Sequence, residues 1–196
     1  MLLDKIKKYN VYLASQSPRR HLLLEQMGIN FNIATSIQVN ENFPDILKAE
    51  EIPMYLSEKK SDAYKSLLKD NRLLITADTI VWQNNKVLPK PSNEAEAIKI
   101  LKLLSNNFHE VITGITIRTV DKLNTFYCST KVWFRAINQE EINYYVKNFK
   151  PFDKAGAYGI QEWIGISAIE KIEGSYYNIM GLPTQKLYVV LDKFLD

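Results

Sequence analysis

Residues 73–82, LLITADTIVW, form a long, β-rich and largely apolar run. The first half of this run is apolar enough for the central strand of a sheet. Helix and strand signals alternate through the rest of the 196 residues, with hairpins among them. This order of elements predicts an α/β fold in which helices flank a mixed central sheet. No internal repeat or Gly/Ser linker divides the sequence, so its length predicts one domain, residues 1–196, or one domain with two lobes around a cleft.

Apolar periodicity and capping residues set the expected limits of the other elements. Asn93 and Asn138 each precede a glutamate by three residues, a pattern typical of a helix start. The segment 151–183 is rich in glycine and aromatic residues, and we expect loops and short strands there. The expected strands are 10–14, 30–35, 73–82, 110–119 and 125–137, and the expected helices are 18–27, 52–68, 94–104, 139–148 and a final one capped by Thr184.

The composition excludes several classes of protein. Apolar residues make up 46% of the chain and charged residues 24%, as in ordinary soluble domains. A net charge of +3, with acidic residues among the lysines, lacks the clustered basic patch of a nucleic-acid-binding protein. The two histidines lie too far apart in sequence to suggest a His-rich zinc site. A single cysteine, Cys128, the lack of a signal peptide and the lack of any apolar run of about 20 residues predict a cytoplasmic protein with no membrane partner.

An anion site is expected in the stretch LASQSPRR, residues 13–20, where the first strand passes into a helix. The N-terminus of a helix offers backbone N–H groups to an anion, and the hydroxyls of Ser15 and Ser17 add to them. The guanidinium forks of Arg19 and Arg20 match phosphate groups. These two side chains lie about 100° apart around the helix axis. We therefore expect one to contact the substrate and the other to pair with a carboxylate. The alternative is a solvated helix start with Ser17 as a plain cap.

Three further segments place reactive or charged groups in apolar or rigid surroundings. Asp78, with Thr79 beside it, interrupts an apolar run, where a carboxylate must be paired, hydrogen-bonded or metal-bound. Asp78 is expected either to be a magnesium ligand or proton acceptor, or to be an aspartate at a strand end that accepts hydrogen bonds from turn amides. Lys90 lies between two prolines that stiffen its loop, although alone it would read as a surface lysine. Lys154 and Gln161 flank glycines that permit close approach of a ligand.

Taken in order, the segments LASQSPRR, ADT, KP, HEVITGI, DKAGAYGIQ and GSYYNIMGLP resemble the motifs of the Maf family of nucleoside triphosphate pyrophosphatases. They span residues 13–183, which is most of the chain. The resemblance implies a Maf/ITPase-like fold with two lobes around a substrate cleft, often as a homodimer. It implies hydrolysis of a nucleoside triphosphate to the monophosphate and pyrophosphate with a divalent cation, Mg²⁺ or Mn²⁺. The ending Ile-Gln of AYGIQ resembles the dTTP/UTP-acting branch rather than the branch that acts on methylated GTP.

The resemblance also assigns roles to individual residues. Asp78 matches the proton acceptor, and we expect Asp78 and Glu41 to hold the metal, which lowers the pKa of its bound water. Glu41 and Lys60 fit an acidic loop residue and a helix lysine of the family. The positions tied to substrate choice are Arg19, Thr79 and Gln161, and those in the triphosphate-binding motifs are Ser15, Ser17, Arg20, Lys90 and Lys154.

The chain departs from the family's pattern at four positions. Thr76 and Pro89 stand where glycine is usual or common, and Asn40 stands where an acid often precedes the acidic loop residue. Glu162 replaces the glycine that usually follows AYGIQ. We expect Asn40 to weaken metal binding and Glu162 to alter the base pocket, and no proposed catalytic group is lost.

Base choice can be argued from hydrogen bonds. The edge of uracil or thymine shows an N–H donor between two carbonyl acceptors, and a glutamine amide can meet both kinds of group. Gln161 therefore favours dTTP or UTP, with modified pyrimidine nucleotides as further candidates. Three other functions are weighed against this one. They are a Maf-type pyrophosphatase with a preference for methylated GTP or CTP, a non-enzymatic regulator of cell division that acts through a protein partner, and a nucleic-acid binder.

Overall fold

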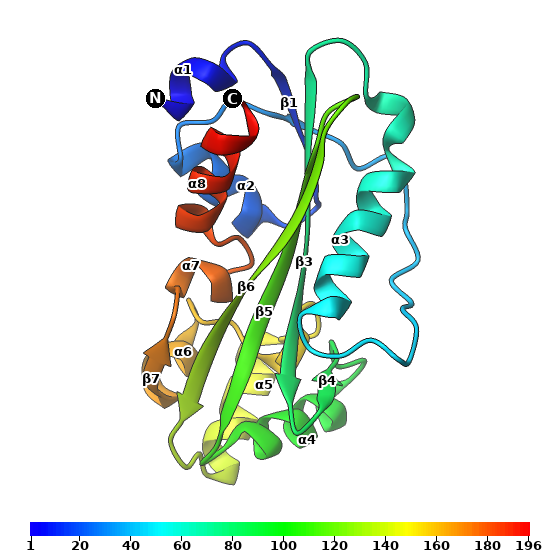
Figure 1. Cartoon of the computed structure of the whole chain (residues 1–196). Helices are drawn as coiled ribbons and strands as arrows, with labels where there is room; N and C mark the ends of the chain where they lie inside the picture. The colour runs from blue at the N-terminus through cyan, green and yellow to red at the C-terminus, as the bar shows by residue number, and fades with distance from the viewer. The chain divides into compact units, whose positions relative to one another are not determined.

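The computed structural model describes residues 1–196 and contains one mixed sheet (Figure 1). Its strands are β1 (Asn10–Ala14), β2 (Asn32–Ile33), β3 (Arg72–Gln83), β4 (Lys86–Leu88), β5 (Phe108–Arg118), β6 (Leu123–Phe134) and β7 (Ile169–Glu173). Their order is β2-β1-β3-β5-β6-β7, with β4 paired to β3. Strand β1 is parallel to β2 and β3, whereas the β3–β4 and β6–β7 pairs are antiparallel. The predicted mixed sheet and the predicted central strand at 73–82 are therefore confirmed.

The helices begin close to the residues that the capping patterns predict. They are α1 (Leu2–Ile6), α2 (Pro18–Gln26), α3 (Glu51–Ala63), α4 (Glu94–Leu104), α5 (Gln139–Phe149), α6 (Trp163–Ala168), α7 (Tyr176–Ile179) and α8 (Thr184–Phe194), with 3₁₀ turns η1 (Lys65–Leu67) and η2 (Ala155–Ala157). The side chains of Asn93 and Asn138 each accept a bond from the backbone N–H three residues on, at 2.9 Å. No helix has both the length and the apolar character needed to cross a membrane.

Four of the expected elements differ from the observed ones. Strand β2 has two residues rather than the predicted six of 30–35. Helix α3 ends at Ala63 because Tyr64 is buried and its hydroxyl bonds both backbone groups of Ile37. The segment 151–183 contains α6 and α7 besides β7. Helix α8 starts at Thr184 itself, and no side chain caps it, so the predicted Thr184 cap is wrong.

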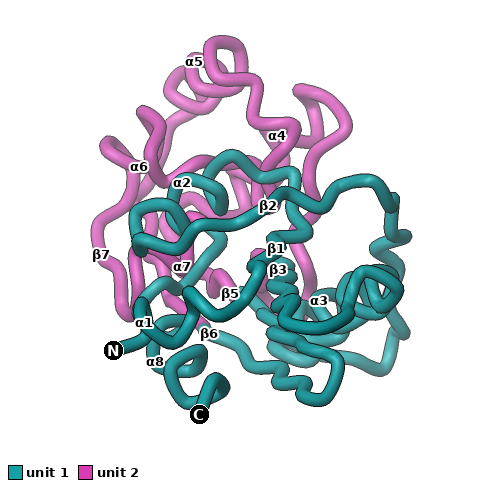
Figure 2. Tube along the Cα trace, turned by 90° about the horizontal axis from the view of Figure 1, so that it is seen from above, with its two compact units in different colours: residues 1–78, 113–128, 181–196 teal, residues 79–112, 129–180 magenta.

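The chain divides into two compact units, each built from more than one stretch of sequence (Figure 2). The first unit comprises Met1–Asp78, Thr113–Cys128 and Gly181–Asp196. Within it α3 lies on one side of the sheet and α1, α2 and α8 lie on the other (Figure 1). A Cβ atom at Gly114 of β5 would lie 2.3 Å from the carbonyl carbon of Pro53, so glycine is needed for α3 to approach this strand. Lys5 joins α1 to the C-terminal segment through Asp192 and Asp196, at 3.0 and 2.6 Å.

The second unit comprises Thr79–Ile112 and Ser129–Met180. Its core includes a mutual edge-to-face packing of His109, Phe134 and Tyr158, with ring centroids 5.0–5.3 Å apart. Nε2 of His109 lies 2.8 Å from the Tyr158 hydroxyl. Asn178 is fully buried and donates to the carbonyl of Val111 and the hydroxyl of Thr130. Buried polar side chains of this kind fix the relative position of the strands that they bridge.

His109 should make the stability of the fold depend on pH. Burial lowers the pKa of its imidazole from 6.5 to about 3, so the unfolded chain binds the additional proton between these values. Stability should therefore fall as the pH drops through 6.5 towards 3, by about 2 kcal/mol at pH 5. His109→Gln should remove this part of the pH dependence while its amide still reaches Tyr158. Urea unfolding at pH 7.5 and 5.0 measures the difference, and an identical pH dependence in both proteins would contradict the assignment.

Candidate functional site

The turn between β1 and α2 carries the two serines predicted to face an anion. Ser17 occupies the N-cap position of α2 and Pro18 follows it, as predicted. The Ser17 hydroxyl makes no capping bond, and its backbone N–H instead donates to Oγ of Ser15 at 3.2 Å. The first turn of α2 holds no acidic residue, so no carboxylate of the helix offsets its positive end. The turn thus keeps the electrostatic character that an anion site requires.

Arg20 fastens this turn to two other segments of the first unit. Its Nε donates to the carbonyl of Gly181 at 2.8 Å, and one terminal nitrogen donates to the carbonyl of Ala77 at 2.9 Å and to Ser15 Oγ at 3.3 Å. Burial lowers the pKa of the guanidinium, the charges of Asp78 and Glu41 raise it, and the charge of Arg19 lowers it. Arg20 therefore has a bracing role, which agrees with the expectation that Arg19 is the arginine tied to substrate choice.

Glu41, Lys60 and Asp78 form a second group in the same unit, which we call the Lys60 cluster. Nζ of Lys60 lies 2.7 Å from Oε1 of Glu41 and 2.5 Å from Oδ1 of Asp78. Asp78 is 8% exposed, whereas the Glu41 side chain is 50% exposed. The buried carboxylate thus has the charged partner that its position in an apolar strand requires. The three side chains come from a loop, from α3 and from β3.

Helix α3 is held in place beside Asp78 by buried hydroxyls. Thr76 donates to the carbonyl of Ser57 at 2.6 Å, and the Ser57 hydroxyl lies 3.0 Å from that of Thr116. Ser57 and Lys60 are three residues apart and so share a face of the helix. Thr76, which stands where the family commonly has glycine, therefore fixes the part of α3 that presents Lys60 to Asp78.

The carboxylates of Glu41 and Asp78 are the donors predicted to bind a divalent cation. Mg²⁺ is usually held by one or two carboxylates together with water and substrate phosphates. The chain gathers no three His, Cys, Asp or Glu side chains that could hold a metal ion, and the Lys60 ammonium contacts both carboxylates. The donor set therefore fits a cation that also binds a phosphate. It does not fit an ion held by protein side chains alone.

The second unit carries Thr79, Lys90, Lys154 and Gln161. Thr79 follows Asp78 in β3 and is half-buried, and Lys90 is exposed. The backbone N–H of Gly156 donates to the carbonyl of Pro89 at 3.3 Å, which joins the Lys90 loop to the segment of Lys154. Gly156 has φ +70°, and a Cβ there would lie 2.8 Å from a methyl group of Val81. Gln161 is exposed and its amide makes no hydrogen bond, so it is available to a ligand.

Lys154 makes two ion pairs in this unit. Its Nζ lies 2.7 Å from Oδ1 of Asp153 and 3.0 Å from Oε1 of Glu162, and its side chain is only 11% exposed. The other carboxylate oxygen of Glu162 accepts a short hydrogen bond from the hydroxyl of Tyr145. Burial, followed by the bond to Glu162, raises the pKa of that hydroxyl well above its usual range, so it stays protonated and donates. Glu162 contacts Lys154, Tyr145 and Gly159 in this unit, and its expected effect on the base pocket stays a prediction.

Comparison with known proteins gives the family. A family model described as Maf-like protein matches residues 10–194. The chain belongs to the Maf family. A protein of Parabacteroides distasonis, named dTTP/UTP pyrophosphatase, is 49% identical over 193 residues, covering 98% of this chain and 100% of its own. A protein of Cytophaga hutchinsonii with the same name is 50% identical over 196 residues, covering 100% of this chain and 89% of its own.

Solved structures support the fold of this Maf chain. The structure of a HAM1 protein from Coxiella burnetii covers 94% of this chain and 99% of its own, with a TM-score of 0.51. The two sequences are 16% identical, so the likeness concerns the fold alone. It agrees with the mixed α/β architecture that the sequence predicts.

Several residues that support the Maf motifs were not foreseen from the sequence. Nε2 of His21 lies 2.7 Å from the carbonyl of Ser15, and Arg20 bonds the carbonyl of Gly181, which has φ +105°. Tyr145 reaches Glu162 and accepts the backbone N–H of Gly159 at 3.0 Å. Among the supporting residues, Asn178 and Gly181 could have been noticed in the sequence. Each is a polar or conformationally permissive residue within the aromatic motif GSYYNIMGLP.

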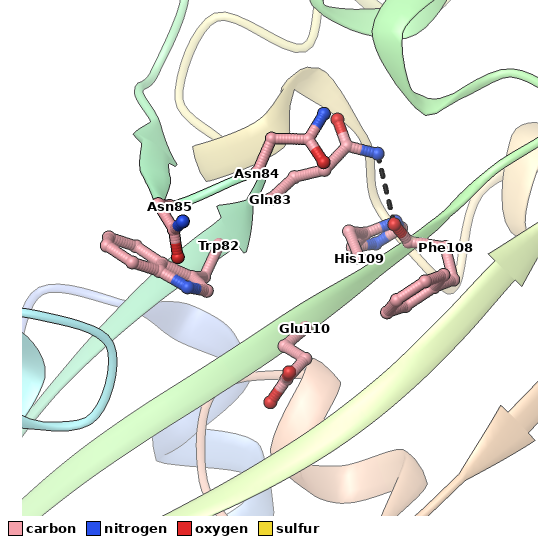
Figure 3. Close-up of a pocket in the computed structure, with 7 residues that line it drawn as sticks. All are labelled: Trp82, Gln83, Asn84, Asn85, Phe108, His109 and Glu110. Atoms are coloured by element: carbon pink, nitrogen blue, oxygen red, sulfur yellow. Dashed lines mark hydrogen bonds between the residues drawn. The ribbon is translucent and has the colours of Figure 1, made fainter.

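One cavity of the second unit lies among residues to which no catalytic or binding role is assigned (Figure 3). Its volume is about 180 Å³, and its lining comes from the end of β3, the following turn and the start of β5, namely Trp82, Gln83, Asn84, Asn85, Phe108, His109 and Glu110. The amide of Gln83 donates to the carbonyl of Phe108 at 3.0 Å (Figure 3). None of the lining residues belongs to the predicted site.

Proposed function

We propose that this Maf protein hydrolyses a pyrimidine nucleoside triphosphate, dTTP or UTP, to the monophosphate and pyrophosphate. The names of its relatives support this substrate class. The observation that carries the proposal is the Lys60 cluster, in which a buried carboxylate lies against an ammonium group. Ser15 and Arg20 belong to the same unit, and Arg20 bonds the carbonyl of Ala77, the residue before Asp78. These contacts support the assignment of phosphate-binding cations and a proton acceptor to this unit.

The positive charges of the predicted site suit a triphosphate. The whole chain has a net charge of only +3, so a local excess of cations must come from their placement. Positioning and charge neutralisation supply most of the catalysis in phosphoryl-group chemistry. The cations assigned to phosphate binding are Arg19, Arg20, Lys60, Lys90 and Lys154.

Asp78 is assigned to the proton of the attacking water. The water oxygen bonds to the α-phosphorus, the bond from that phosphorus to the bridging oxygen breaks, and pyrophosphate leaves with the electron pair. The proton passes to a carboxylate oxygen of Asp78, while Lys60 holds this side chain in place. When bound, a divalent cation would be held by Glu41 and Asp78 and would supply positive charge to the phosphates. We place the reaction in the cytoplasm, where the single cysteine would stay reduced.

A panel of nucleoside triphosphates tests the proposed function. Each nucleotide is incubated with the protein and Mg²⁺, or with Mn²⁺, and both pyrophosphate and monophosphate are measured. Equal amounts of the two products from UTP and dTTP are expected. Release of orthophosphate instead would contradict attack at the α-phosphorus, and turnover of only methylated GTP or CTP would contradict the pyrimidine assignment made here.

Gln161→Glu should shift base preference. An ionised glutamate cannot donate to a uracil carbonyl, but it can accept from the N–H groups of guanine. We expect the ratio of kcat/KM for UTP to that for GTP to fall by about tenfold or more. Because Gln161 is exposed, its replacement should leave the melting temperature unchanged. The same ratio in both proteins would remove Gln161 from base selection.

A further inference from the structure

Lys154 forms ion pairs with two carboxylates, and Glu162 is the one that is not adjacent to it in sequence. The two residues are joined at 3.0 Å, and their side chains are 24% and 11% exposed. Asp153 also contacts Lys154, but it is the adjacent residue and its side chain is 64% exposed. Solvent screens such an exposed pair strongly. The contact with Glu162 is therefore the one that can hold the ammonium group in a fixed position.

Tyr145 and Gly159 hold Glu162 itself in place. Its second carboxylate oxygen accepts the bond from Tyr145, whose hydroxyl also accepts the backbone N–H of Gly159. The backbone N–H of Glu162 donates to the carbonyl of Gly159 at 3.0 Å, which closes the turn that carries Gln161. A Cβ atom on Gly159 would lie 2.7 Å from the carboxyl carbon of Glu162. The carboxylate is thus packed over Gly159, with one oxygen hydrogen-bonded to Tyr145 and the other in an ion pair with Lys154.

This arrangement limits what Lys154 can offer to a ligand. An ammonium group has three N–H donors. Here one of them donates to Asp153, and Glu162 lies within ion-pair distance. Even if the ion pair with Glu162 occupies a second donor, one donor remains for a phosphate oxygen. Ordering a lysine side chain costs conformational entropy, and a lysine already ordered in the free protein does not lose that freedom on binding.

We propose that Glu162 is a positioning residue, which holds Lys154 so that its remaining donor is presented to the phosphates of the nucleotide. This inference rests on the proposed function, because it takes a nucleoside triphosphate as the ligand. Glu162 contacts the substrate only through Lys154. It replaces a glycine of the family's usual pattern, so in this chain the lysine has a carboxylate partner that a glycine could not provide.

A double-mutant cycle between Glu162 and Lys154 tests the proposal. The readouts are the dissociation constant of a UTP analogue with a methylene bridge between the α- and β-phosphorus atoms, and the separate KM and kcat values for UTP. Glu162→Ala should weaken analogue binding by about tenfold in the wild-type background, since the lysine loses its fixed position. In the Lys154→Met background the same change should weaken binding less than about twofold. KM should rise with the dissociation constant.

Two further variants keep the test independent of folding defects. Glu162→Gln retains an acceptor oxygen and replaces alanine in the cycle if the alanine variant does not fold. It should weaken binding less than Glu162→Ala does. Glu173→Gln is the matched control, because Glu173 pairs with Lys171 at 3.1 Å in the same unit but both side chains are at least 60% exposed. It should leave the dissociation constant unchanged.

The outcomes separate this inference from the proposed function. Wild-type protein that neither binds the analogue nor releases pyrophosphate from UTP contradicts the proposed function. Wild-type protein that does both, with an equal loss from Glu162→Ala in the two backgrounds, overturns the positioning role alone. The same holds if Glu162→Ala binds the analogue as tightly as the wild type. A loss confined to the background that retains Lys154 supports the proposal.

Discussion

Asp78→Asn is expected to lower the rate of pyrophosphate release from UTP by about a thousandfold, within the range that proton transfer by a positioned side chain contributes. Asparagine has nearly the same shape but cannot accept the proton of the attacking water. It also removes the negative charge that faces Lys60 at 2.5 Å. The measurement is kcat for pyrophosphate release, together with the melting temperature to show that the variant is folded.

Asp62→Asn provides the control for Asp78→Asn. Asp62 lies in α3, two residues after Lys60, and pairs with Arg118 at 2.6 Å and with Lys65 at 3.0 Å. The bond from Arg118 is the main cause that lowers the pKa of Asp62, and Asp62, like Asp78, is paired with a cationic side chain. Its removal should change kcat by less than about twofold, because most partly exposed pairs contribute little. A folded Asp78→Asn enzyme with kcat close to that of wild type would refute the role of Asp78.

The elements that local sequence determines were predicted well. The run at 73–82 is rich in apolar and β-branched residues, which favour a strand, and β3 extends only one residue further at each end. The two Asn-x-x-Glu patterns act within a single turn, so the starts of α4 and α5 could be located without tertiary contacts. Both the apolar run and the capping patterns depend only on residues a few positions away in sequence, which is why they could be interpreted without the fold.

Other boundaries depend on contacts that the sequence does not display. Periodicity continues past Ala63, but the helix stops because Tyr64 turns inward and bonds Ile37, which lies 27 residues earlier. The short length of β2 follows from its pairing with β1 at only two positions, Tyr12 with Asn32 and Leu13 with Ile33, and the sequence does not show this pairing. Tertiary packing decided both cases, and local propensity could not.

In the candidate site, too, some features could be predicted from local sequence and others depend on tertiary contacts. A lone carboxylate in an apolar run signals a partner, so Asp78 could be singled out from its neighbours alone. That the partner is Lys60, on a helix whose position Thr76 and Ser57 fix, follows only from the fold. The contact between Glu162 and Lys154 was missed because a glutamate eight residues from a lysine, across two glycines, carries no regular spacing.

The two adjacent arginines of LASQSPRR should respond differently to the same substitution. Arg20→Lys is expected to lower the free energy of unfolding by about 2–3 kcal/mol, since one ammonium group cannot replace the guanidinium fork. The carbonyls of Ala77 and Gly181 are buried, and at least one of them would lose its donor. Urea unfolding measures this loss.

Arg19→Lys should instead act on the substrate. Arg19 is one helical position away from Arg20 and points about 100° from it around the axis of α2. We expect the KM for UTP to rise about tenfold, with a smaller loss of unfolding free energy than in Arg20→Lys. Equal destabilisation by the two substitutions would contradict this division. So would an Arg20→Lys protein as stable as wild type, because the bonds from the Arg20 guanidinium to Ala77 and Gly181 would then not be what fastens the turn to β3 and to Gly181.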